Sequence, residues 1–123
     1  MAYMTDRKRA AGLGSARTGS EHHWQMTLSS WALLILTPLF LIAWGPAIGM
    51  AHEDVLARFA RPFPAIVTAL MLVAGFQHFR QGVQVLIEDY TEGMTRQLLI
   101  VATVCLSYGA MATGLFALVR LAL

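Results

Sequence analysis

The chain has 123 residues, of which 57% are hydrophobic and only 13% charged, with a net charge of +2. A soluble domain carries about a quarter charged residues, so this composition excludes an ordinary small soluble domain. A membrane-spanning helix needs roughly 20 apolar residues, and this length therefore accommodates three spans with short connections. The sequence predicts an all-α membrane protein with three transmembrane helices and a polar N-terminal tail.

The tail covers residues 1–23 and is rich in Gly, Ser, Ala and basic residues. It is predicted to be extended or partly disordered and to lie on the membrane face or on a partner protein. A signal peptide is the competing interpretation, because Gly49-Met50-Ala51 resembles a cleavage site. Against it, the apolar run is too long and begins too late for an ordinary signal peptide. The chain is therefore divided into this tail and a three-helix membrane anchor domain, residues 24–123.

The first span is predicted at about residues 26–47. Trp24 and Trp44 lie near its ends, where aromatic side chains favour the two membrane interfaces. Pro38 in mid-span removes one backbone hydrogen bond and is expected to kink the helix. Ser29 is expected to bond back to its own helix or to line a pocket beside the histidines at the end of the tail.

The second and third spans are predicted at about residues 64–87 and 98–119, with connections at 50–61 and 88–96. Gly109 and Gly114 in the last span are interpreted as small residues that allow another helix to pack closely. The single cysteine, Cys105, lies inside the same apolar run and has no cysteine partner in the chain, so it is interpreted as a packing residue.

The distribution of basic residues predicts the orientation. The tail holds four Lys or Arg residues, and the connection 88–96 lies on the same side of the membrane. The positive-inside rule then places the N-terminus and this connection in the cytoplasm and the C-terminus outside.

The second span carries the residues that suggest chemistry. His78 sits at bilayer depth, where an ionisable residue is costly and rarely without a role. It shares one helical face with small and apolar residues and with an acid at the helix end: Met71, Ala74, Gly82, Val85 and Asp89. Imidazole is a common axial ligand of haem iron, and small residues allow close approach of a flat cofactor or another helix. A structural hydrogen bond between helices is the alternative role.

Other polar residues of this span imply partners. Arg80 points roughly opposite His78, where it snorkels, pairs with an acid of another protein chain or approaches haem propionates. Gln77, Gln81 and Gln84 suit a face buried in protein rather than in lipid. No other histidine lies inside a span, so a second protein ligand to a haem would come from a different chain.

Asp89 and Tyr90 end the second span at the membrane surface. They suit an ordinary helix terminus with an interfacial tyrosine. The functional alternative is a quinone site. In it the Tyr90 hydroxyl donates to a quinone carbonyl, and Asp89 either influences that hydroxyl or relays protons. No nucleophile–base pair, phosphate-binding glycine loop, zinc spacing or dinucleotide fingerprint is present.

The pattern of His78 and, after ten intervening residues, Asp89-Tyr90 resembles the hydrophobic membrane anchor of bacterial and mitochondrial succinate dehydrogenase, respiratory complex II. The resemblance extends over nearly the whole chain, including three spans and a tail like that of proteobacterial members. Its tail motifs are Leu13-Gly14-Ser15-Ala16 and Gly19-Ser20-Glu21-His22-His23-Trp24.

The resemblance implies a haem b ligated by His78 and by a histidine of a companion haem-binding anchor. Gly82 would pack on the haem face. Tyr90 would bond a ubiquinone carbonyl, with Asp89 adjacent, near the cytoplasmic side of the bacterial inner membrane. An iron–sulfur subunit would close that site and deliver electrons taken from succinate by a flavoprotein carrying FAD.

One departure affects the haem propionates. Some relatives carry an arginine early in the first span, whereas residues 24–29 here contain none. His22, His23 and Ser29 are therefore the expected propionate contacts.

The sequence leaves three other interpretations open. A fumarate reductase anchor has the same architecture with the reaction reversed. A small transport protein would use His78 and Asp89 as a proton relay without haem. A structural assembly anchor would use the histidine only for packing.

Overall fold

The computed structural model describes residues 5–12 and 19–123 and is helical throughout, without strands in these ranges. Three helices are long and apolar enough to cross a membrane: α2 (Gly19–Trp44), α4 (Pro62–Tyr90) and α5 (Gly93–Ala122). The predicted fold class is confirmed, and the chain is a multi-pass membrane protein. The tail motif at residues 13–16 lies outside the described residues.

The helices are longer than predicted, and two segments differ from expectation. Part of the predicted tail is helical, because α1 (Asp6–Ala11) lies within it and α2 begins at Gly19. Thr5 caps α1 by accepting from the Lys8 amide over 3.3 Å. Glu21 in the first turn of α2 suits the positive end of the helix dipole. Such capping groups extend helices into sequence whose composition alone suggests a coil.

The connection predicted at 50–61 also contains a helix, α3 (His52–Phe59), after the 3₁₀ turn η1 (Gly45–Ala47). Its acids lie in the first turn and its arginine in the last, which is the favourable order for the helix dipole. Phe59 at its end is fully buried, with its ring centroid 4.6 Å from that of Trp44. Burial of this aromatic pair folds α3 back onto the end of the membrane helices.

Two arginines, one in the last turn of α3 and one in the first turn of α5, each cap the membrane helix that precedes them. The Arg58 guanidinium donates to the carbonyls of Ala43, over 2.8 Å, and Ile42, over 3.0 Å, at the end of α2. Arg96 donates likewise to Thr91, over 2.7 Å, and Glu88, over 2.9 Å, at the end of α4. The last carbonyls of a helix have no partner inside it, so these donors satisfy groups that water or lipid headgroups would otherwise meet.

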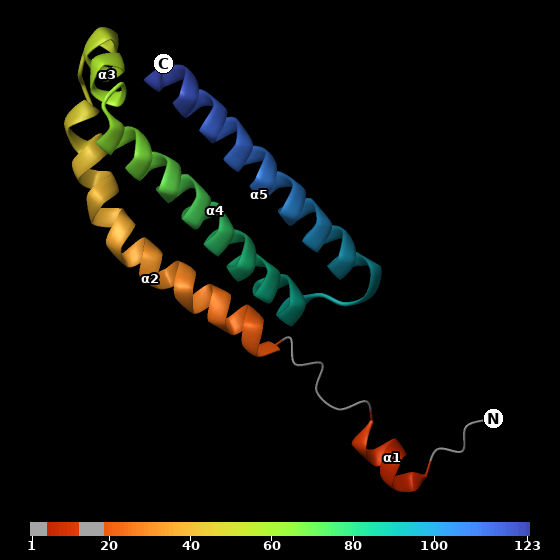
Figure 1. Cartoon of the computed structure of the whole chain (residues 1–123). Coiled ribbons are helices and arrows are strands. Elements are labelled where there is room, and N and C mark those ends of the chain that lie inside the picture. The colour runs from red at the N-terminus through yellow and green to blue at the C-terminus, as the bar shows by residue number, and fades with distance from the viewer. Residues whose placement is uncertain (1–4, 13–18) are drawn as a thin grey trace.

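The membrane helices form a single layer with α4 in the middle (Figure 1). In the described residues α4 packs against both α2 and α5, whereas the backbones of α2 and α5 do not come close to each other. Near one end of the layer, the Trp44 indole N–H donates to the hydroxyl of buried Thr68 over 2.8 Å and links α2 to α4. A single layer leaves both of its broad surfaces uncovered, and many large apolar side chains are accordingly exposed to lipid or to partner subunits.

Candidate functional site

His78 lies on the side of α4 that faces α2. Its Nδ1 is 2.9 Å from the hydroxyl oxygen of Ser29, and the imidazole is half-buried. The hydrogen bonds of the described residues engage only Nδ1, which leaves Nε2 available as a ligand atom. The predicted alternatives for Ser29 were a bond to its own helix and a place in a pocket. The structure adds the direct pairing with His78, which sequence reasoning missed.

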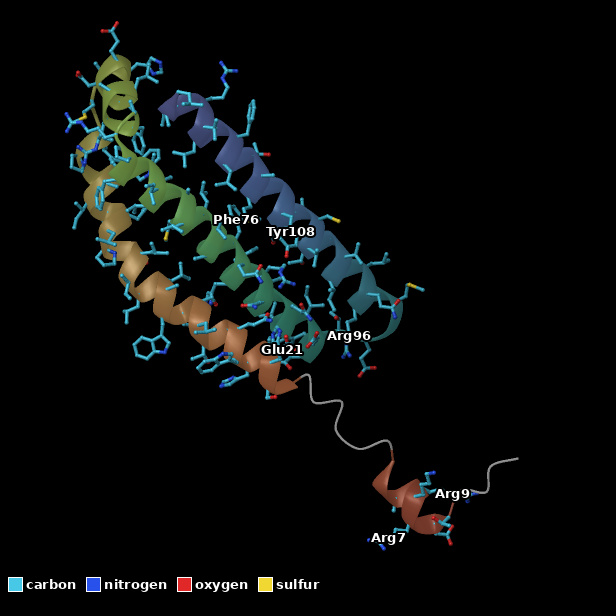
Figure 2. All side chains as sticks on the ribbon, in the orientation of Figure 1. Arg7, Arg9, Glu21, Phe76, Arg96 and Tyr108 are labelled. Carbon is cyan, nitrogen blue, oxygen red and sulfur yellow. The ribbon has the colours of Figure 1, made fainter. Side chains whose placement is uncertain are left out.

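A continuous polar network extends from this pair toward the start of α2. The Ser29 hydroxyl lies 3.4 Å from Oε1 of Gln81, a side chain with no exposed surface. The Gln81 amide nitrogen donates to Oε1 of Gln25 over 3.2 Å, and the Gln25 amide nitrogen lies 3.5 Å from a carboxylate oxygen of Glu21. Glu21 lies near the beginning of α2 (Figure 2). The four-residue spacing of Glu21, Gln25 and Ser29 was the sequence signal for one shared polar face.

His78 also borders an open groove on the surface of the layer. Its other lining residues come from α2 and are mostly apolar: Ser30, Leu33, Leu34, Thr37 and Pro38. The described residues hold no cluster of three or more His, Cys, Asp or Glu that would bind a bare metal ion. A haem needs only one or two axial ligands and an apolar surface for its ring, and the residues around His78 fit that requirement.

Gly82 lies one turn beyond His78 and also faces α2. A Cβ atom there would lie 3.9 Å from the terminal methyl of Met26. This is an ordinary van der Waals distance, so the position lies at the contact of α4 with α2 and has room for a small side chain.

Asp89 and Tyr90 lie at the end of α4, where both are exposed. Tyr90 is 82% exposed. It follows His78 by twelve positions, which is about 18 Å along a helix. The structure therefore does not bring the two predicted sites into contact, and a pocket around Tyr90 requires surface from another chain.

His22 and His23 occupy the first turns of α2. The Nε2 atom of His22 is buried without a hydrogen-bond partner among the described residues, whereas His23 is exposed. His22 precedes Ser29 by seven positions, so it lies on the same face of α2, two turns away. It is thus the better placed of the two to meet a polar group of a ligand or partner on that face.

Arg80 lies on the opposite side of α4, as predicted. Its guanidinium carbon is 5.9 Å from the ring centroid of Tyr108 on α5, within the range of a cation–π contact. Figure 2 shows Phe76 and Tyr108 between α4 and α5. Arg80 Nε and the Ser107 hydroxyl are buried there without partners among the described residues.

These features define a membrane protein that presents a histidine between two spans and depends on other chains. Residues 1–111 match the family described as succinate dehydrogenase/fumarate reductase transmembrane subunit. The chain belongs to this family, and the resemblance inferred from the His78 to Tyr90 pattern is confirmed.

Two relatives are each named succinate dehydrogenase hydrophobic membrane anchor subunit. The protein from Paracoccus denitrificans is 47% identical over 123 residues, which is 100% of this chain and 95% of the relative. The protein from Rickettsia bellii (strain RML369-C) is 30% identical over 96 residues, 76% of each chain. No solved structure gives a significant match. Membership of this family makes the chain a membrane anchor of a larger enzyme complex.

Proposed function

We propose that this chain anchors a succinate:ubiquinone oxidoreductase and contributes to two of its sites. His78 supplies one axial ligand to a haem b shared with the companion haem-binding anchor. Tyr90 and Asp89 form part of the ubiquinone-reduction site. The chain is not catalytic alone, since FAD and the iron–sulfur clusters belong to the flavoprotein and iron–sulfur subunits.

The observation that carries the haem proposal is the state of the His78 imidazole. One ring nitrogen is hydrogen-bonded to Ser29 and the other is left for a ligand, beside an open groove of mostly apolar residues. This is the arrangement of histidines that ligate metals, because the partner of the second nitrogen orients the ring. A bound haem supplies one-electron redox chemistry, and Gly82, one turn from the ligand, would pack on the haem face.

The exposure of Tyr90 supports the quinone proposal. Its exposed hydroxyl would donate to a quinone carbonyl, and the neighbouring exposed Asp89 carboxylate would accept a proton or orient water. The iron–sulfur subunit closes this surface, which excludes water from the quinone ring. His22 is the proposed propionate contact, with His23 at the edge of that region.

The proposed location is the bacterial inner membrane. The basic residues of α1 and Arg96 support a cytoplasmic N-terminus and a cytoplasmic connection between α4 and α5. The C-terminus of α5 then lies on the periplasmic side.

Two alternative functions, a fumarate reductase anchor and a proton relay, have different support. The family description covers fumarate reductase as well, but both relatives above are named for succinate dehydrogenase. A proton relay from His78 to Asp89 has little support, because the network of His78 leads through two carboxamides, which do not titrate, toward Glu21.

The haem proposal is tested with the whole complex purified in mild detergent. We expect His78→Ala to remove the b-type haem band from the dithionite-reduced minus oxidised spectrum, because the iron loses an axial ligand. His52→Ala is the matched control, since His52 is exposed at the start of α3. An unchanged haem-to-protein ratio in His78→Ala would contradict the assignment.

The quinone proposal is tested by Tyr90→Phe in the same complex. We expect ubiquinone reduction to fall about 10-fold or more, as for loss of a positioned proton donor, while succinate oxidation by a soluble dye stays near wild type. Loss of both activities together would indicate failed assembly, and full retention of ubiquinone reduction would exclude the Tyr90 hydroxyl from the site.

A further inference from the structure

The hydrogen bonds around Ser29 bear on which nitrogen of His78 carries the proton. The Ser29 oxygen has three polar neighbours: the Met26 carbonyl at 2.8 Å, His78 Nδ1 at 2.9 Å and Gln81 Oε1 at 3.4 Å. The carbonyl and the amide oxygen only accept hydrogen bonds, and a hydroxyl has a single proton to give. His78 is therefore the one neighbour able to donate to the Ser29 oxygen.

A neutral His78 carries its proton either on Nδ1 or on Nε2, and the burial of Gln81 favours Nδ1. Its side chain has no exposed surface, and Ser29 is the donor that the structure provides to its Oε1. If Ser29 donated to His78 instead, that buried oxygen would be left without a donor, which is unfavourable away from water. The Met26 carbonyl does not depend on Ser29 for a donor, because the Ser30 hydroxyl also donates to it over 2.9 Å.

We propose that Ser29, held by the buried Gln81–Gln25 amide pair, is a positioning residue that fixes His78 as the Nδ1-protonated tautomer and so presents Nε2 to the iron. The ligand role of His78 rests on the function proposed above, whereas the tautomer does not. A hydrogen bond from Nδ1–H to an oxygen also makes Nε2 a stronger electron donor and restricts rotation of the ring. Ser29 thereby acts on the haem through His78.

The test compares two serine variants and one control in the assembled complex. We expect Ser29→Ala to shift the haem midpoint potential to more positive values and to weaken haem retention about 10-fold. Ser29→Thr keeps the hydroxyl and is expected to retain both properties. Thr113→Val is the control, because the Thr113 hydroxyl lies on α5 and bonds only the Gly109 carbonyl of its own helix within the described residues.

Two results would overturn the proposal separately from the haem assignment. The first is an unchanged potential and haem retention in Ser29→Ala when His78→Ala does lose its haem. The second comes from the ¹⁵N spectrum of histidine-labelled complex prepared without haem, in which the His78 signal is the one that disappears in His78→Ala. A proton on Nε2 in that spectrum would contradict the tautomer whether or not haem is the ligand, and a proton on Nδ1 would support it.

Discussion

The two sides of α4 are packed in different ways. Toward α2, the contact contains His78 and the buried Gln81, joined to Ser29 and Gln25 by directional hydrogen bonds. Toward α5, a Cβ added to Gly114 would lie only 3.2 Å from a methyl of Leu72, and the contact is a close fit of helix against side chain. The same helix thus meets α2 through a chain of hydrogen bonds, and it meets α5 through close packing together with the cation–π contact of Arg80 and Tyr108.

The two contacts therefore differ in how strictly they specify the rotation of each helix. Hydrogen bonds between helices specify the rotation of each helix, because a misplaced donor or acceptor in an apolar environment stays unpaired. Small residues allow close approach but specify rotation less strictly. The side of α4 that holds the candidate ligand is the side with the directional contacts, as expected for a site that must orient an imidazole.

Among the variants that test this comparison, Gln81→Leu is expected to lower stability most. It keeps the approximate volume of the side chain but removes the polar group. Gln25 and Ser29 lose their shared partner, and we expect a loss of about 1–3 kcal/mol of stability. The measurement is the thermal midpoint of the purified complex together with its haem content, both of which should fall.

Gln84→Leu is the control for this variant. Gln84 lies on the same helix, but its amide donates over 2.8 Å to Glu88 within α4 and makes no bond to α2 in the described residues. If Gln84→Leu lowers the midpoint as much as Gln81→Leu, the polar contact between α2 and α4 has no special role.

A smaller effect is expected on the other side of α4. Gly114→Ala places a methyl against Leu72, whereas Gly109 has no atom within 4 Å of its Cβ position in this chain. Both changes raise the helix propensity of α5 equally, so their difference isolates the contact with α4. We expect Gly114→Ala to be less stable than Gly109→Ala by about 1 kcal/mol, measured as the difference in thermal midpoint. Equal midpoints would show that the Leu72 side chain moves aside without loss.

The sequence predicted the three spans and the opposite placement of His78 and Arg80, because apolar run length and helical periodicity are local properties. It did not predict α3, whose stability depends on burying Phe59 against Trp44, a contact between distant positions. It also missed the pairing of Ser29 with His78, since helical periodicity gives the face of each helix but not the height at which two helices align.

The polar network between α2 and α4 is another feature that the sequence did not predict. Gln81 was recognised as part of a polar flank, but its complete burial and its bond to Gln25 depend on how α2 and α4 are packed. The exposure of Tyr90, by contrast, follows from its place at a helix end. The proposed quinone site would be completed by other subunits, so it lies beyond what this chain alone specifies.

The separation of the α2 and α5 backbones in the described residues bears on how the chain is made. Every close backbone contact between membrane-spanning helices there joins helices that are neighbours in chain order. Folding is fast when contacting segments are close in sequence, because little loop-closure entropy is lost. As translation proceeds, each new span therefore finds its intrachain partner already inserted in the bilayer. Membrane insertion can advance one helix at a time, and no early span waits for the last one to emerge from the ribosome.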